Sequence, residues 1–345
     1  MRWSSPEMPN NALVSSRAMP GAAAIVMLAA ACTTSPSVVV TTSSALTPTT
    51  TPMTTAAPET TTTIATTTSA VAPPPPSTFA IIGDYGNAGP EEVAVSAMIH
   101  DLRPEYIATV GDNAYGPAGF DAVVGQYFAD YIGDYTGVHG DGAGVNRFFP
   151  ALGNHDYTDV GIDEYLDFFT LPGAGYASSS GNERYYDVVL GPIHWYLVNS
   201  DGREPDGITA DSAQAAWLEA RLAASTEPWQ VVAFHHAPYG SAHHGGEEAL
   251  RWPFAAWGAD LVLTGHNHNY ERFAVDGITY VTVGLGRTNV PLDGDPDPHS
   301  VFFYGGVDSG ALFIEACDTA LSAEFRTIGA GVVDTFTIGT GTCSG

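Results

Sequence analysis

Phe79-Ala80-Ile81-Ile82-Gly83-Asp84 is the first of five stretches in which an apolar run ends at a polar side chain. Four consecutive apolar residues before a glycine predict a short strand that is buried on both faces. A helix is predicted from Pro90 to Leu102, with Pro90 in its first turn and an apolar face that includes Val93, Ala97 and Leu102. A buried strand followed by a helix favours a layered α/β fold.

The other four stretches repeat this pattern. Residues 106–110 precede Gly111-Asp112, residues 148–152 precede Gly153-Asn154-His155-Asp156, residues 229–234 precede His235-His236, and residues 261–263 precede Thr264-Gly265-His266-Asn267-His268. Ligand sites of open α/β sheets lie beyond the carboxyl ends of the strands. We therefore expect these polar side chains to meet in one place. Further strands are predicted at residues 280–283 and 311–316, with a closing hairpin of residues 323–325 and 333–338.

Three segments are predicted along the chain. Residues 1–32 contain Arg2 and Arg17 before an apolar stretch that is too short to span a bilayer, which indicates a signal peptide. Ala29-Ala30-Ala31-Cys32 resembles a bacterial lipobox, and an ordinary cleaved signal is the alternative. Residues 33–78 are rich in Thr, Ser and Pro, which predicts an extended stalk. Residues 79–345 form the predicted catalytic domain.

The charge of the chain limits its partners. There are 38 acidic and 11 basic residues, all of the latter arginine, and the net charge is −27. A nucleic-acid-binding protein needs a basic surface, so no nucleic-acid partner is expected. Long-range repulsion of polyanions favours small phosphate esters over polynucleotides. The only membrane contact that we expect is an N-terminal lipid anchor on Cys32, which would make the protein a cell-surface lipoprotein or, without it, a secreted protein.

The cysteines agree with an extracytoplasmic location. With Cys32 assigned to a lipid, Cys317 and Cys343 remain, and two cysteines in an exported domain are expected to form a disulfide. Two free thiols are the alternative.

Seven of the strand-end residues are possible metal ligands. One such aspartate is usually a cap or turn residue, and one such histidine is usually structural. Seven together at five strand ends need the compensating charge that a metal supplies. Two ions of different kind are indicated, because the acids and the phenol suit a trivalent ion and the neutral ligands suit a divalent ion. The seven are Asp84, Asp112, Tyr115, Asn154, His235, His266 and His268.

In the same order, the five stretches resemble the motif blocks of purple acid phosphatases. Gly83-Asp84 and Gly153-Asn154-His155-Asp156 are shared with the whole calcineurin-like phosphoesterase superfamily, whereas Tyr115, three residues after Asp112, is typical of the purple group. Residues 265–272, which read GHNHNYER, agree with this resemblance, as does the pair His243-His244. The resemblance implies a four-layer αββα sandwich with two mixed β-sheets.

The resemblance also implies a role for each residue. Asp84, Asp112, Tyr115 and His268 would hold Fe(III), while Asn154, His235 and His266 would hold a divalent ion (Zn, Fe or Mn) that shares Asp112. A metal-bound hydroxide would attack the phosphorus of a phosphate monoester, as in an acid phosphatase. His155 would orient the phosphate, and His244, with or without His243, would protonate the leaving group.

Some features depart from the family or leave alternatives open. His236 stands where the family usually has another residue, which leaves it as a donor beside the ligands or as a loop residue. Arg287 is interpreted as a surface ion-pair partner rather than as a phosphate contact. The N-terminal domain of plant relatives is replaced by the stalk, so a monomer is expected. A phosphodiesterase or nucleotide hydrolase with Mn or Zn, and a non-catalytic surface binding lipoprotein, are the alternative functions.

Overall fold

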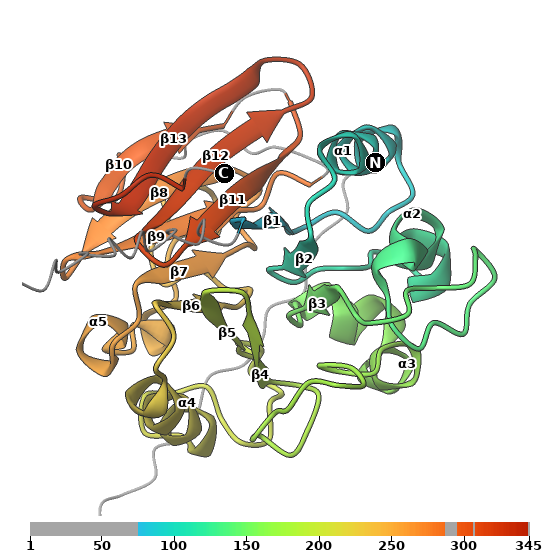
Figure 1. Cartoon of the computed structure of the whole chain (residues 1–345), viewed down its shortest axis with the longest axis horizontal. Coiled ribbons are helices and arrows are strands. Elements are labelled where there is room, and N and C mark those ends of the chain that lie inside the picture. Colours follow the sequence, from blue (N-terminus) through green and yellow to red (C-terminus); the bar gives the residue numbers. More distant parts are fainter. Residues whose placement is uncertain (1–74, 287–294, 306–307, 344–345) are drawn as a thin grey trace, which may run out of the picture. The chain divides into compact units, whose positions relative to one another are not determined.

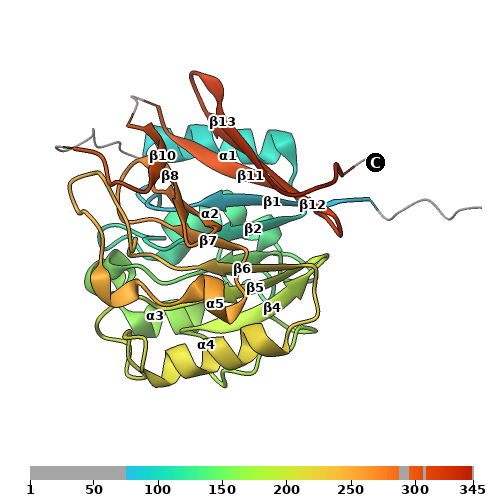
Figure 2. The same ribbon diagram turned by 90° about the vertical axis from the view of Figure 1, so that its left-hand side faces the viewer.

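The computed structural model describes residues 75–286, 295–305 and 308–343. The predicted signal peptide, nearly all of the predicted stalk, and Arg287 lie outside the described residues. Two mixed β-sheets stack on each other, with α1 on the outer side of one sheet and α4 on the outer side of the other (Figures 1 and 2). This arrangement confirms the predicted α/β fold with two mixed sheets.

The first sheet carries the N-terminal strands at one side and the C-terminal strands at the other. Its order is β13-β12-β11-β1-β2-β3. β1, β2 and β3 are parallel, and β11, β12 and β13 add to β1 in antiparallel order. The bounds are β1 (Ser77–Ile82), β2 (Tyr106–Thr109), β3 (Phe148–Pro150), β11 (Gly310–Cys317), β12 (Ala320–Thr327) and β13 (Gly331–Gly339).

The second sheet is formed by the middle of the chain, in the order β10-β8-β9-β7-β6-β5-β4. β5, β6, β7 and β9 are parallel, whereas β4, β8 and β10 pair antiparallel with their neighbours. The bounds are β4 (Tyr186–Leu190), β5 (Ile193–Leu197), β6 (Trp229–Ala233), β7 (Leu261–Thr264), β8 (Tyr270–Val275), β9 (Ile278–Val283) and β10 (Ser300–Tyr304).

Each central strand of the second sheet is buried on both faces. In β6, Val231 and Ala233 join the core cluster that also contains the first sheet, while Val232 packs with α4 and α5 on the other side. Leu261 and Val262 of β7 divide in the same way. Successive side chains of a strand point to opposite faces. A continuous apolar run is therefore what this sheet requires.

The helices lie outside the sheets, and α1 packs through a different face from the predicted one. The expected apolar residues Val93, Ala97 and Leu102 are exposed, and α1 is buried through Glu92, Val95, Ser96 and Ile99. The prediction was wrong because both stripes of the helix carry apolar residues, and only packing on the sheet decides between them. The helix bounds are α1 (Pro90–Leu102), α2 (Gln126–Phe128), α3 (Ile162–Phe168), α4 (Ala213–Ala224) and α5 (Phe254–Trp257).

A disulfide joins Cys317 at the end of β11 to Cys343 near the C-terminus, with Cα atoms 5.6 Å apart. The predicted pairing is confirmed. Among the described residues, no helix has the length and apolar character needed to cross a bilayer.

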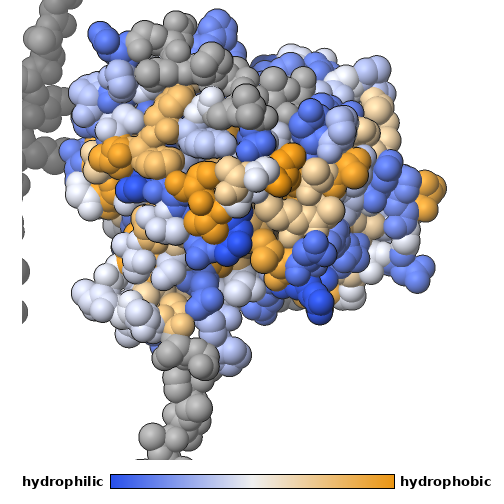
Figure 3. All heavy atoms as spheres, turned by 90° about the horizontal axis from the view of Figure 1, so that it is seen from above, coloured by the Kyte–Doolittle hydropathy of each residue, from blue (hydrophilic) through white to orange (hydrophobic). Residues whose placement is uncertain are grey.

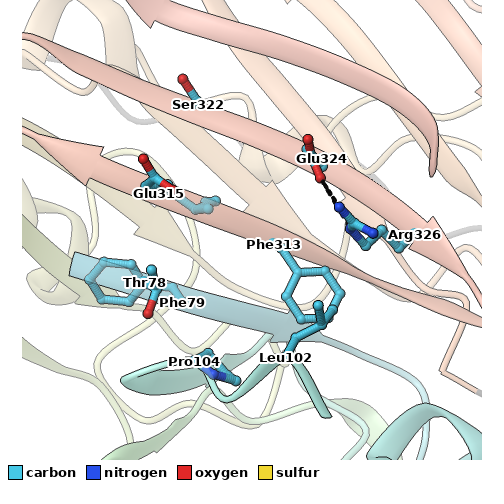
Figure 4. Close-up of a pocket in the computed structure, with 10 residues that line it drawn as sticks. Thr78, Phe79, Leu102, Pro104, Phe313, Glu315, Ser322, Glu324 and Arg326 are labelled. Carbon is cyan, nitrogen blue, oxygen red and sulfur yellow. Dashed lines mark hydrogen bonds and ion pairs between the residues drawn. The ribbon is translucent and has the colours of Figure 1, made fainter. Parts of the chain in front are cut away.

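The outer face near α1 and the β12–β13 hairpin carries exposed apolar side chains, which form a band across the surface when the molecule is viewed from above (Figure 3). A surface pocket of about 380 Å³ lies close by, between β1, β11, β12 and the end of α1. Figure 4 shows Phe313 and Leu102 in this pocket, with the ion pair of Glu324 and Arg326 at its side. None of the predicted site residues lines this pocket.

Candidate metal centre

The seven predicted ligands follow parallel strands of the two sheets. Asp84 follows β1 and Asp112 follows β2, while His235 and His266 follow β6 and β7. Three of these residues have left-handed backbone angles, with φ of 56° at Asp84, 51° at Asp112 and 67° at His266. Such conformations are costly for non-glycine residues and are found preferentially at functional sites.

One half of the centre is formed by Asp84, Asp112, Tyr115 and His268. The phenol oxygen of Tyr115 lies 3.2 Å from Asp84 Oδ1, 2.9 Å from Asp112 Oδ2 and 3.3 Å from His268 Nε2. His268 Nε2 also lies 3.3 Å from Asp84 Oδ1. Four side chains from two sheets therefore direct oxygen and nitrogen atoms at one point.

The other half contains Asn154, His235 and His266. His235 Nε2 lies 3.0 Å from Asn154 Oδ1, 3.2 Å from His266 Nδ1 and 3.4 Å from Asp112 Oδ1. Asp112 thus has one carboxylate oxygen on each half, since its other oxygen faces Tyr115. The structure brings all seven predicted ligands together at one place.

A glycine allows the loops after β2 and β3 to approach each other. A Cβ atom on Gly153 would lie 2.2 Å from the backbone nitrogen of Asp112. No other residue fits without displacing a predicted ligand.

Burial and charge set the protonation of the centre. Burial alone would raise the pKa of Asp112, but the charge and hydrogen bond of His235 outweigh it and hold that pKa below its ordinary value. Burial lowers the pKa of His266 to about 2, with the charges of His235 and His236 acting in the same direction. A carboxylate and a neutral imidazole are the forms in which these residues bind metals.

His155 lies beside the ligands. Its backbone N–H donates to Asp112 Oδ1 at 2.8 Å, and its ring is 4.4 Å from the ring of Tyr115. Its Nδ1 lies 3.0 Å from Asp159 Oδ2. Burial would raise the pKa of Asp159, but hydrogen bonds from Gly116 and His155 lower it. The carboxylate accepts the Nδ1–H of His155 and so fixes the orientation of the ring beside the centre.

His244 and His243 are exposed at the rim of the centre. The ring of His244 lies 4.2 Å from that of His266 and 6.3 Å from that of His268. The ring of His243 lies 4.8 Å from that of His244, tilted by 55°. Burial lowers the pKa of His244, and the charges of His243 and His268 lower it further. This position suits His244 for the predicted proton donation, with His243 further from the ligands.

Besides Asp159, two further supporting residues, Asp156 and Ser200, were given no role in the sequence analysis. Asp156 is fully buried and accepts hydrogen bonds from Asn113 and from the N–H groups of Ala114 and Gly153. Burial raises the pKa of Asp156 to about 8, and the charge of Asp112 contributes. Ser200 contacts His235 and His236 from the loop after β5.

Sequence signals for these three residues differ in strength. Asp156 belongs to the motif at residues 153–156. Ser200 follows the apolar run of β5, which has the same pattern as the five recognised stretches. Asp159 has no such signal, because its importance arises from its contact with His155.

The chemistry of the donors fits a pair of metal ions. Buried Asp84, Asp112 and His235 offer ligand atoms that all lie within 4.8 Å of one another, and His235, His236 and His266 form a second such group. A phenol oxygen and an amide oxygen complete the set. Hard oxygen donors on one side and imidazoles on the other suit two ions of different kind.

Comparison with known proteins agrees with this site. Residues 61–270, more than half of the chain, match the family model of the calcineurin-like phosphoesterases. Purple acid phosphatase 18 of Arabidopsis thaliana is 29% identical over 68% of this chain and 56% of its own length. Tartrate-resistant acid phosphatase type 5 of Rattus norvegicus is 25% identical over 72% of this chain and 85% of its own. The chain thus spans little more than half of the plant relative.

A solved structure, GAP50, the anchor in the inner membrane complex of Plasmodium, has the same fold. It aligns with a TM-score of 0.59 at 16% identity, over 78% of this chain and 90% of that one. The family model, which covers more than half of the chain, shows that the chain belongs to the calcineurin-like phosphoesterase family.

Proposed function

We propose that the protein is an acid phosphatase that hydrolyses small phosphate monoesters at a centre of two metal ions. The observation that carries this proposal is Asp112, whose two carboxylate oxygens face the two groups of ligands. A carboxylate shared between two ions is suited to hold them at the ~3.5–4 Å separation used in phosphoryl displacement. The resemblance to proteins named acid phosphatases supports the same activity.

Each residue around the phosphate has its own role in the proposed reaction. Two bound metal ions would activate water and neutralise the charge of the phosphate. His155, oriented by Asp159, contacts a phosphate oxygen and stabilises the charge that develops there. His244 gives its proton to the leaving alkoxide, which otherwise departs slowly. Asp112 and Tyr115 fix the position of His155 through their contacts with it.

The metals would be Fe(III) and a divalent ion. Asp84, Asp112, Tyr115 and His268 would hold Fe(III), because three of them present hard oxygen atoms. Asn154, His235 and His266 would hold Zn, Fe(II) or Mn. Tyr115 as a ligand to Fe(III) would give the protein a pink to violet colour.

The protein would act outside the cytoplasm as a monomer, at the cell surface through lipid on Cys32 or in secreted form. The disulfide of Cys317 and Cys343 supports this location, because such bonds persist in oxidising compartments. Its net charge of −27 supports small esters as substrates and opposes nucleic acids.

Metal analysis, a visible spectrum and a panel of phosphomonoesters and phosphodiesters on the purified protein test the proposal. We expect about two metals per chain, one of them iron, together with a visible absorption band and faster hydrolysis of monoesters. A colourless protein that is fully active with zinc alone would exclude the Fe(III)–Tyr115 assignment. Faster hydrolysis of diesters would identify a phosphodiesterase, and metal binding without turnover would indicate a binding protein.

A further inference from the structure

We propose that His236 is a further catalytic residue, a neutral hydrogen-bond donor whose Nε2–H binds a phosphate oxygen next to His266. The inference rests on the proposed function and decides between the two roles that the sequence left open for His236, a donor beside the ligands or a loop residue. It follows from three hydrogen bonds to one serine.

Ser200 fixes the proton on the ring of His236. The Ser200 hydroxyl oxygen accepts the backbone N–H of His235 at 3.2 Å and that of His236 at 2.9 Å. A hydroxyl has two acceptor lone pairs and one hydrogen. With both lone pairs used, its hydrogen is directed to His236 Nδ1, 3.0 Å away. Nδ1 is therefore an acceptor, and the proton of the neutral ring lies on Nε2.

The neighbouring histidine has the opposite arrangement. His235 Nδ1 lies 2.9 Å from the carbonyl oxygen of Val110, which can only accept. His235 therefore carries a proton on Nδ1, and its Nε2 is the nitrogen that faces Asn154 and Asp112, where a metal would bind. The Nδ1 atoms of the two adjacent histidines thus have opposite roles, a donor in His235 and an acceptor in His236.

His236 is close enough to act on the same substrate. Its ring lies 4.5 Å from the ring of His266, and one ring nitrogen of each of His235, His236 and His266 lies within 4.8 Å of the others. Since Ser200 occupies Nδ1, the nitrogen left for the centre is Nε2. A phosphate oxygen at the divalent site would meet that N–H.

A neutral donor suits this position. An imidazolium beside two metal cations would be repelled by them, whereas a neutral N–H adds a hydrogen bond to the phosphate without adding charge. The protonated ring would also direct a second N–H at Ser200, whose lone pairs are already used.

The test separates a donor from a ligand and from a merely structural residue. Metal content and the Kd for inorganic phosphate would be measured on metal-loaded wild type and on His236→Phe, His236→Asn and Ser200→Ala. His100→Phe is the matched control, since His100 is also partly buried and stacks on an aromatic ring, that of Phe128, but lies on α1. Calorimetric titration with phosphate requires no turnover, so the result does not depend on whether esters are hydrolysed.

We expect about two metals per chain in every variant and a phosphate Kd that rises about tenfold or more in His236→Phe. His236→Asn keeps a hydrogen-bond donor, and Ser200→Ala lets the His236 proton move between the two ring nitrogens, so both should raise the phosphate Kd by smaller factors. His100→Phe should have the Kd of wild type. Loss of one metal in His236→Phe would make His236 a ligand and overturn the proposal. Unchanged phosphate affinity in His236→Phe, or in Ser200→Ala, would overturn it as well. An absence of ester hydrolysis by wild type would instead contradict the proposed function.

Discussion

Asp112 joins the two groups of ligands, because Oδ2 faces Tyr115 and Oδ1 faces His235. We expect Asp112→Ala to lose both metals, since removing a shared ligand weakens both ions at once. Metal analysis of the purified variant checks this. Asp334→Ala is the control, because Asp334 is also buried but pairs with Arg272 on the outer strands. Two metals retained by Asp112→Ala would show that the bridging role is misplaced.

His244 is the predicted acid, and its effect should depend on the leaving group. His244→Ala should slow the hydrolysis of alkyl phosphates by roughly 10²-fold or more, because an alkoxide needs a proton to depart. Hydrolysis of p-nitrophenyl phosphate should slow much less, since nitrophenolate is stable without one. Comparing kcat for the two substrates checks this.

His243→Ala is the control for that experiment. The ring of His243 packs at a tilt against that of His244, and it is His244 whose ring contacts His266, so removal of His243 should leave the ratio of the two rates nearly unchanged. Equal slowing of both substrates by His244→Ala would exclude the acid role.

At the residue scale, the sequence was sufficient to predict the metal ligands but not the residues that form hydrogen bonds with the histidines beside them. Asp84, Asp112 and His235 could be chosen because each follows an apolar run, directly or after one glycine, and the ends of parallel strands meet at one edge of a sheet. Ser200 and Asp159 could not be chosen in this way. Their roles depend on single hydrogen bonds to His236 and His155, which arise only once the loops have packed.

At the scale of elements, α1 begins with a buried carboxyl group. Glu92 is 1% exposed, and its Oε2 accepts the backbone N–H groups of Asn87 and Ala88, in the loop between Asp84 and the helix. Its Oε1 has no hydrogen-bond partner in the described part of the chain. Burial raises the pKa of Glu92 to about 8, although the two backbone hydrogen bonds lower it. The folded protein thus favours the protonated form.

This pKa shift predicts how stability changes with pH. An acid whose pKa is raised by folding binds more protons in the folded state, so its contribution to stability is lost as the pH rises toward the folded pKa. Glu92→Gln keeps an acceptor for both N–H groups and does not titrate. As the pH rises from about 5 to about 8, we expect the Tm of wild type to fall relative to that of Glu92→Gln. A Tm difference that stays constant across this range would contradict the shift.

The strands and helices that could be predicted are those whose order of apolar and polar residues fits only one structure. β6 and β7 are apolar on both faces because both faces are buried, so a continuous run suffices to identify them. The face of α1 could not be predicted, since Val93 and Val95 are equally apolar and only the sheet selects Val95. β4 and β8 mix apolar with charged residues and were not recognised.

At the scale of the whole centre, the ligands come from both sheets. Asp84, Asp112 and Asn154 follow strands of the first sheet, whereas His235 and His266 follow strands of the second. Two bound metal ions would therefore link the two sheets at the edge where these strands end. The unfolded chain has no such arrangement, so metal binding should stabilise the folded state.

Removal of the metals should therefore lower the Tm of the protein. With free metal about 100-fold above its Kd, binding contributes about 2.7 kcal/mol, which corresponds to a Tm difference of about 5 °C or more for a domain of this size. Calorimetry of the metal-loaded protein and of the same protein after chelation and dialysis would measure this difference. Asp112→Ala should show no change with chelator, because it should hold no metal to lose. Equal Tm values for the metal-loaded and the metal-free wild type, with metal content verified, would mean that the ligands of the two sheets do not bind the same metal ions.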